Sequence, residues 1–355
     1  MLRFLSGNTK EVQKLFLKLP KVLYLPSVCP QNKKEELAIL NGTHAISNDI
    51  EVHPFVVAND KDPICRCLMT YYPNDDTAYV GFFESTNNPE AVCAMFKRVE
   101  EKAKADGKKM LLGPINSSIY IGYRFKTSGF DKVFTGEPYN HPHYAELWEK
   151  AGFIEHSKYV SNYLRQVQEE DLDPRMKNVY QRYVDRGYQF VSTDDNLFVD
   201  HLEHVYDLMM ESYSKFDGFK KLTKEQFISM FSYLGGIVDH RMVKLAYNPD
   251  NELKAFCVCI PNYGEAAMGK MTPAKLIRLA KIKKQPSEYV IMYVGADRGA
   301  VGLGSAIVQL IRDELYKNKC TSIGALIKEG NLTGKMYDDL YVDQSTYVLF
   351  SKSLS

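Results

Sequence analysis

A strand, a glycine-rich loop and a helix follow one another near the C-terminus, and this succession constrains the fold more than any other part of the chain. The apolar run 289–294 has the composition of a buried strand, and a helical pattern follows the loop to about Asn318. The loop contains Gly295, Gly299, Gly302 and Gly304. Glycines let the backbone approach a ligand closely, and the N–H groups at a helix start bind phosphate or pyrophosphate. The segment therefore predicts a site for a phosphate-containing ligand.

Two common phosphate-binding loops do not fit this segment. A Walker loop needs a lysine between its second glycine and its Ser or Thr, whereas Gly304 is followed directly by Ser305. A dinucleotide fingerprint needs a third small residue where this chain has Ile307, and an acidic residue on the next strand, 321–326, which has none. The remaining interpretation is a loop for one pyrophosphate, preceded by a strand that can hold the rest of a long ligand.

The segment resembles motif A of the GCN5-related N-acetyltransferase (GNAT) superfamily, in which Gln/Arg-x-x-Gly-x-Gly/Ala joins a strand to a helix and binds the pyrophosphate of acyl-CoA. Gly302 and Gly304 match the two small positions, while the Gln/Arg position falls on Gly299 and Arg298 stands one residue early. The resemblance implies acyl-CoA or acetyl-CoA as co-substrate. The coenzyme-binding residues that it implies are Tyr293, Val294, Gly299, Ala300, Val301, Gly302, Leu303, Gly304, Ser305 and Asn331. The alternative is a glycine-rich turn that only packs a helix on a sheet.

Two later residues add to this resemblance. Asn331 and Tyr337 follow the strand 321–326, at positions where family members commonly have an asparagine and a tyrosine. By resemblance, Asn331 contacts the pantetheine arm and Tyr337 is the catalytic acid that protonates the departing thiolate. A phenol with a pKa of about 10 stays protonated at neutral pH and can act in this way. The alternative for Tyr337 is core packing or a surface position.

Composition and charge set limits on the other classes of protein. The chain has 355 residues, enough for two domains, with 45 Lys and Arg against 44 Asp and Glu. A net charge of +1 provides no overall basic field that would attract nucleic acid. No apolar run approaches the roughly 20 residues of a membrane span, and residues 1–20 are amphipathic, unlike a signal peptide.

The seven cysteines indicate a reducing compartment and predict a cytoplasmic protein. Two Cys-x-Cys pairs, 65/67 and 257/259, lie in alternating apolar runs. A spacing of two residues puts both thiols of a pair on one face of a strand, where reduced cysteines act as small hydrophobic side chains. Zinc is the alternative ligand, but no His/Cys cluster completes a site, and we predict no metal.

The order of the elements predicts an α/β (α+β) chain of two tandem GNAT-like domains, each a mixed, mostly antiparallel sheet flanked by helices. Residues 1–168 read as three strands, a helix opened by Asn88 and Pro89, a strand, a second helix ending at Gly152 and a long strand at about 156–166. The first helix is entered without a GxG, and Glu84 stands where phosphate charge would need accommodation. The first domain therefore resembles a copy that kept the fold and lost the coenzyme loop.

Residues 169–355 read as a second, acyl-CoA-binding GNAT-like domain after the polar boundary 168–174. The whole chain also resembles a group of bacterial tandem acetyltransferase-like proteins, through 80–84, 113–116 and 139–144. In such a pair, the acceptor pocket is expected where the two sheets face each other.

The resemblance implies an acyl-CoA-dependent N-acyltransferase whose acceptor is an amine of a small molecule or amino acid. Backbone N–H groups of the 289–294 strand would polarise the thioester carbonyl, and a base would deprotonate the amine. Glu211 and Glu265 are candidates by location, and solvated surface carboxylates are their alternative role.

Three other functions remain open at this point. A transferase that uses aminoacyl-tRNA would need a basic face, which the run 275–284 offers, but no intact coenzyme loop. The second is a non-catalytic acyl-CoA-binding protein, and the third is a purely structural interaction protein. The sequence determines neither the acyl chain length, nor the acceptor, nor the oligomeric state.

Overall fold

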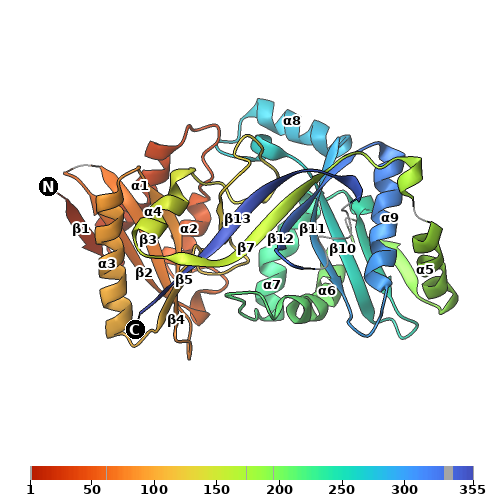
Figure 1. Ribbon diagram of the computed structural model, residues 1–355, viewed down its shortest axis with the longest axis horizontal. Helices are drawn as coiled ribbons and strands as arrows, with labels where there is room; N and C mark the ends of the chain where they lie inside the picture. The colour runs from red at the N-terminus through yellow and green to blue at the C-terminus, as the bar shows by residue number, and fades with distance from the viewer. Residues whose placement is uncertain (1, 61, 173, 195, 332–338, 355) are drawn as a thin grey trace.

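The computed structural model describes residues 2–60, 62–172, 174–194, 196–331 and 339–354, which form a mixed α/β fold around one large sheet (Figure 1). The helices are α1 (Lys10–Leu23), α2 (Lys33–Leu40), α3 (Pro89–Ala105), α4 (His143–Lys150), α5 (Pro174–Asp185), α6 (Phe198–Tyr213), α7 (Lys224–Phe231), α8 (Pro273–Lys284) and α9 (Leu303–Asn318). The strands are β1 (Arg3–Ser6), β2 (Glu51–Ala58), β3 (Pro63–Tyr71), β4 (Thr77–Ser85), β5 (Met110–Gly113), β6 (Phe125–Lys126), β7 (Ile154–Leu164), β8 (Gln189–Ser192), β9 (Val243–Tyr247), β10 (Leu253–Pro261), β11 (Glu288–Ala296), β12 (Thr321–Lys328) and β13 (Tyr341–Ser353).

The sheet runs without interruption through both halves of the chain, which we call the first half (1–168) and the second half (169–355). Its strand order is β1-β2-β3-β4-β5-β13-β7-β12-β11-β10-β9-β8, with β6 paired to β13. Most neighbours are antiparallel, and β4 with β5 and β11 with β12 are the parallel pairs among the described strands. This mixed sheet flanked by helices is the fold class expected from the sequence.

The two halves exchange their last strands. β13, the last strand of the chain, pairs with β5 of the first half from Phe350 to Ser353 and with β7 along most of its length. β7, from the first half, pairs with β12 of the second half on its other side. Figure 1 shows β13 ending beside β5, so that the C-terminus lies in the first half. The long strand expected at 156–166 to complete the first half therefore lies between two strands of the second half.

Each half contains a parallel strand–helix–strand unit of the same kind. In the first half α3 connects β4 to β5, and in the second half α9 connects β11 to β12. Pairing within each unit is short: it ends at Tyr79 with Leu112 in the first half and at Ile291 with Gly324 in the second. Beyond these residues the two strands of a unit separate.

The start of α3 follows directly from the local sequence. The side chain of Asn88 accepts a hydrogen bond from the N–H of Ala91 at 3.0 Å, and Pro89 occupies the first turn. These residues fix the helix start because the cap satisfies a free N–H and proline has no N–H to satisfy. The predicted helix opened by Asn88 and Pro89 is confirmed, and α3 spans Pro89–Ala105.

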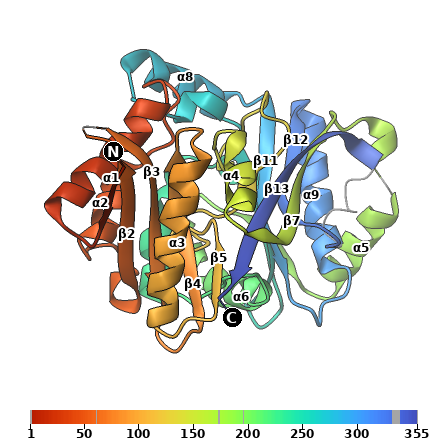
Figure 2. The ribbon, with the colours of Figure 1, turned by 60° about the vertical axis from the view of Figure 1, so that its left-hand side comes forward.

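Helices cover both faces of the sheet, and buried hydrophobic clusters join the two halves. In the first half, Phe83 of β4, Phe96 of α3 and Trp148 of α4 form an aromatic cluster. In the second half, α5 packs on α9 at the far end of the molecule (Figure 2). On the other face, buried side chains from α1 and α2 pack in one cluster with those from α6 and α7. The helices α1, α2, α6 and α7 therefore hold the halves against each other where their sheets meet.

The two Cys-x-Cys pairs lie on strands and are buried. Cys65 and Cys67 belong to β3 and Cys257 and Cys259 to β10, and each of the four thiols has an accessible fraction of 0%. They are free cysteines inside the core. Their location confirms the expectation of small hydrophobic side chains on strand faces.

Gly81 on β4 provides a test of the close packing between β4 and the segment after β5. A Cβ atom at this position would lie 2.0 Å from the carbonyl oxygen of Ile115. Gly81→Ala is expected to lower the free energy of unfolding by at least about 2 kcal/mol, because backbone atoms have to move. The matched control is Gly236→Ala, whose Cβ would meet no atom within 4 Å; it should change the value by less than about 1 kcal/mol. Urea unfolding of both variants checks this, and equal losses would contradict it.

Candidate active site

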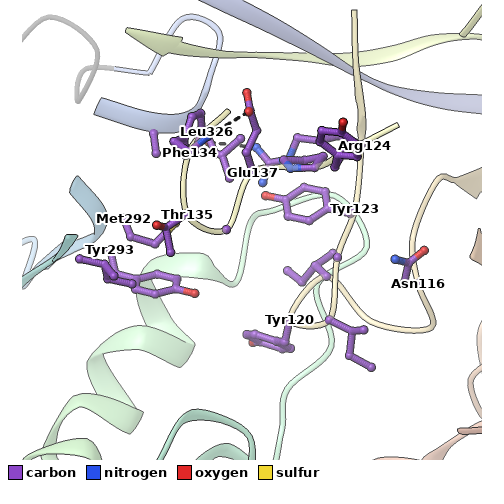
Figure 3. Close-up of a pocket in the computed structure, with 18 of the residues that line it drawn as sticks. Asn116, Tyr120, Tyr123, Arg124, Phe134, Thr135, Glu137, Met292, Tyr293 and Leu326 are labelled. Atoms are coloured by element: carbon purple, nitrogen blue, oxygen red, sulfur yellow. Dashed lines mark hydrogen bonds between the residues drawn. The ribbon is translucent and has the colours of Figure 1, made fainter. Parts of the chain in front are cut away.

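A cavity of about 990 Å³ lies between the two halves, and we call it the central cavity (Figure 3). Segments 119–125 and 133–140 of the first half line one side. From the second half come the ends of β11 and β12 and side chains of α6. In Figure 3, Met292 and Tyr293 lie on one side of the cavity, and Tyr123 and Arg124 lie on the other. Its volume is that of small-molecule sites, and it lies where the sequence led us to expect the acceptor pocket; that it holds an acceptor stays a prediction.

The opening between β11 and β12 supplies backbone to the central cavity. Pairing between the two strands ends at Ile291 with Gly324, and the following residues of both strands, 292–296 and 324–328, line the cavity. The outer edges of the two strands remain paired with β10 and β7. The inner edges therefore form a wedge between two firmly held strands.

A β-bulge lies at the start of this wedge. On β10, Val258 pairs with Tyr293 and the next residue, Cys259, pairs with Ile291, so that Met292 is the extra residue of β11. A bulge bends the strand and redirects its backbone groups. Tyr213, a half-buried side chain at the end of α6, also lines the cavity; burial raises the pKa of its hydroxyl, and the nearby backbone of Val294 lowers it. The bulge therefore presents backbone of β11 to the cavity.

The glycine loop follows directly from β11 and opens α9. Asp297 accepts hydrogen bonds from Gly299 through its carboxylate at 2.7 Å and from Ala300 through its carbonyl at 3.1 Å. Gly302 stands at the N-cap position with a φ of +91°, a left-handed conformation that favours glycine, and no side chain caps the helix. The N–H groups of Gly304 and Ser305 have no acceptor in the part of the chain that the structure describes. The start of α9 therefore keeps N–H groups available for an anion.

The first half repeats the wedge without the loop. Phe82 lies at a register shift in β4 with a φ of +47°, and its N–H donates to the side chain of Asn116 at 2.6 Å. The helix that follows, α3, begins with the Asn88 cap described above. The backbone groups that stay open in the second half are thus bonded within the chain in the first.

Comparison with known proteins supports the architecture that this geometry indicates. No family model matches the chain. Protein YghO of Escherichia coli is 24% identical over 194 residues, which is 54% of this chain and 48% of that protein, so the match spans about half the length of the curated relative. Among solved structures, a tandem GNAT protein from the clavulanic acid biosynthesis pathway matches 100% of this chain and 99% of its own, with a TM-score of 0.52 and 12% identity.

The protein has a tandem GNAT fold. Two other structures agree, each with a TM-score of 0.52 and 73% of its own length covered. One is a probable N-acyltransferase from Enterococcus faecalis, which is 8% identical and matches 100% of this chain. The other is a GCN5-related N-acetyltransferase from Anabaena variabilis, which is 7% identical and matches 99% of this chain. At these identities the likeness concerns the fold.

Within this tandem GNAT fold, the residues that the resemblance assigned to the coenzyme are divided between the central cavity and the glycine loop. Tyr293, Val294 and the exposed Asn331 line the central cavity. The loop residues 299–305 do not line the central cavity, although Ala296 and Arg298 just before them do. Tyr337 lies outside the described residues. The assignment of these residues to a coenzyme remains a prediction.

The two carboxylates proposed from the sequence as bases lie outside the central cavity. Glu211 and Glu265 are exposed, and neither belongs to the lining of the cavity. The location therefore favours their alternative role as solvated surface groups.

The buried carboxylates that line the cavity include Glu137 and Glu84, which sequence analysis did not assign as functional groups. Glu137 accepts from Tyr347 and Lys126 at 2.5 and 2.7 Å, and burial raises the pKa of its carboxyl. Glu84 accepts from the hydroxyls of Tyr144 and Tyr24 at 2.6 and 3.0 Å. Burial raises the pKa of Glu84 to about 7, although a nearby arginine and both tyrosines lower it. Tyr24 and Tyr144 each lie 60 positions from Glu84 in the sequence, and Tyr347 lies 210 positions from Glu137. No local sequence pattern therefore indicated these two carboxylates.

Among the residues that the structure describes, no three His, Cys, Asp or Glu side chains gather in a way that could hold a metal ion. None of the described helices is both long and apolar enough to cross a membrane. The helix α8, which contains the basic run 275–284, is exposed.

Glu84 should make stability depend on pH. Its pKa is about 7 in the folded protein and about 4.5 when unfolded, so the folded state binds the extra proton between these values. The contribution of Glu84 to the free energy of unfolding is therefore fully present below about pH 4.5. It is lost as the pH rises through 7, and the loss is about 3 kcal/mol at most. Glu84→Gln, which cannot ionise, should remove this loss. Urea unfolding at pH 5 and pH 8 checks this: the variant should gain stability relative to wild type at pH 8, and an equal difference at both pH values would contradict it.

Proposed function

We propose that the protein is an acyl-CoA-dependent N-acyltransferase that moves an acyl group from CoA to an amine of a small molecule or amino acid. The observation that carries this proposal is the wedge between β11 and β12, which has its bulge at the central cavity and leads directly into a glycine loop with open N–H groups. Acyl-CoA combines a long arm with a pyrophosphate, and this arrangement offers a backbone edge for the arm and a helix start for the pyrophosphate.

In this proposal the loop binds the diphosphate of CoA. The N–H groups of Gly304 and Ser305, aided by the dipole of α9, donate to its oxygens. Asp297 shapes the loop through the bond from Gly299, and its charge is offset by Lys254, whose Nζ lies 3.2 Å from its carboxylate. Asn331, on the lining of the cavity, would contact the pantetheine arm.

The thioester would lie beside the bulge, where β11 faces the cavity. The N–H of Val294, which lies near the Tyr213 hydroxyl, would donate to the thioester carbonyl oxygen. A preorganised backbone donor of this kind stabilises the oxyanion that develops when the amine attacks. The central cavity would hold the amine next to the carbonyl carbon, which removes much of the entropic cost of a bimolecular reaction.

Three proton transfers complete the reaction: the protonated amine loses one proton before it attacks, the bonded nitrogen loses a second to water, and the departing thiolate gains one. The amine must lose a proton to attack, and Glu84, with a pKa near 7 on the lining of the cavity, is matched to accept it at neutral pH, directly or through water. The tetrahedral intermediate collapses and expels the thiolate of CoA. Tyr337, assigned by resemblance, would give the thiolate its proton.

The first experiment identifies the ligand and the reaction. Mass spectrometry of material retained through purification should detect CoA or an acyl-CoA. A screen of amines with acetyl-CoA and longer acyl-CoAs, read by released thiol, should then show amine-dependent turnover. A protein that binds acyl-CoA without any turnover would be a sensor, and a protein that binds no CoA derivative would contradict the proposal.

Side chains introduced at the loop glycines should weaken coenzyme binding. Gly302→Val and Gly304→Val are each expected to raise the Kd for acetyl-CoA about tenfold or more, because the added side chains crowd the open N–H groups. Tyr337→Phe should lower kcat with less effect on this Kd. Isothermal titration calorimetry and steady-state kinetics check both expectations, and the reverse order of effects on binding would reject these roles.

A matched control separates crowding at the loop from general backbone strain. Gly42, in the first half, also has a positive φ of +72°, and a Cβ there would meet no atom within 4 Å. Gly42→Val therefore introduces strain of the same kind far along the chain from the loop. Both Gly42→Val and Gly302→Val should lower the melting temperature. The Kd of Gly42→Val for acetyl-CoA should equal that of wild type.

A further inference from the structure

Arg124 is a buried cation on the wall of the central cavity. It follows Tyr123 in the first half, has a φ of +68°, and only 6% of its surface is exposed. Its Nη1 donates to the carbonyl oxygen of Leu326 at 3.0 Å, and its guanidinium lies over the rings of Tyr123 and Tyr159, 3.6 and 4.2 Å from their centroids. These partners are all uncharged. The Nε atom, buried in the same place, has no hydrogen-bond partner among the described residues.

This lack of a counter-charge distinguishes Arg124 from two other deeply buried basic residues. Arg66 forms two hydrogen bonds with the carboxylate of Glu36, at 2.7 and 2.9 Å. Lys126 lies 2.7 Å from the carboxylate of Glu137. A buried charge is costly unless it is paired, and in both of these cases the chain supplies the pair. At Arg124 the described residues place no carboxylate within ion-pair distance.

The carboxylate that contacts the same aromatic group is already occupied. Asp217 lies 3.5 Å from the hydroxyl of Tyr159, but its Oδ2 accepts from Ser157 and Lys328, each at 2.6 Å. The charge of Asp217 is thus offset by Lys328. The positive charge of Arg124 remains uncompensated within this network.

Arg124 lies beside the part of the wedge where the thioester is proposed to bind. Leu326, its hydrogen-bond partner, lies on β12 two residues beyond the last pair with β11, at Gly324. Across the cavity from Arg124 lie Met292, the bulge residue, and Tyr293 (Figure 3). A small molecule held by Arg124 would therefore lie in the space between the first half and the bulge.

We propose that Arg124 binds the carboxylate of the acceptor, so that the amine acylated by this protein is an amino acid or another amine that carries a carboxylate. This proposal rests on the proposed function and names the class of its acceptor. The free Nε–H belongs to a planar donor edge that matches the two oxygens of a carboxylate. A single uncompensated guanidinium also matches a group with one negative charge, and the aromatic rings exclude water from the pair.

The test compares acceptors that differ only in the carboxylate. The common L-amino acids and their α-carboxamides are assayed with acetyl-CoA by thiol release, and their binding in the presence of CoA is measured by calorimetry. Wild type should accept at least one free acid with a KM about tenfold or more below that of its amide. Arg124→Gln should raise the KM of that acid about tenfold, which corresponds to about 1.4 kcal/mol, and leave the KM of the amide unchanged.

Three further measurements separate this role from others. Arg124→Lys keeps the charge without the planar fork and should restore part of the preference for the acid. Arg98→Gln is the matched control, because Arg98 also lies over an aromatic ring, 4.8 Å from the centroid of Phe4, but outside the cavity lining; it should leave both KM values unchanged. The Kd for acetyl-CoA should be the same in wild type and Arg124→Gln, so that coenzyme binding is assessed separately from acceptor choice.

Other outcomes would overturn the proposal. Equal use of acids and amides by wild type, or no binding of any free acid, would show that Arg124 does not select a carboxylate. Equal losses for acid and amide in Arg124→Gln, together with a lower melting temperature, would show that Arg124 only fastens β12 through Leu326. Failure of acetyl-CoA to bind would reject the proposed function, while the direct binding comparison of acids and amides would still decide the role of Arg124.

Discussion

The antiparallel pairing of β7 with β13 is the interaction on which the rest of the structure depends. Each strand is the last strand of its own half, and each lies beside strands of the other half. This pairing converts two sheets into one and fixes the angle at which the halves meet. The central cavity, lined from both sides, exists only because of this fixed arrangement. A change that loosened the pairing would therefore alter the cavity even if both wedges kept their local geometry.

The two strand–helix–strand units show how one architecture can support different uses. In the second half, a glycine without a side-chain cap opens α9, and N–H groups stay available. In the first half, Asn88 caps α3 and Asn116 accepts the N–H of Phe82, so the corresponding backbone is bonded internally. The difference lies in a few polar side chains at helix and strand ends. The proposed division of labour follows: one half binds the coenzyme, and the other contributes Arg124 and Glu84 to the acceptor side.

Much of the fold could be predicted because its helices and strands depend on local sequence patterns. The strands β11 and β12 and the helices α3 and α9 lie where the apolar runs, the glycine loop and the Asn88 cap predict them. The strand exchange could not be predicted, because the apolar alternation of β7 is compatible with either sheet. The pairing of β7 is decided by contacts with residues more than 150 positions away.

The sequence by itself determined the glycine loop and its position between a strand and a helix, and its resemblance to the GNAT superfamily predicted the tandem fold. These features depend on neighbouring residues, since backbone conformation and helix capping are local properties. Only the tertiary structure decided which charged side chains share the central cavity. The properties of Glu84, Glu137 and Arg124 depend on their burial and on hydrogen-bond partners distant in the chain. Neither the burial nor the partners can be predicted from a residue's neighbours in sequence.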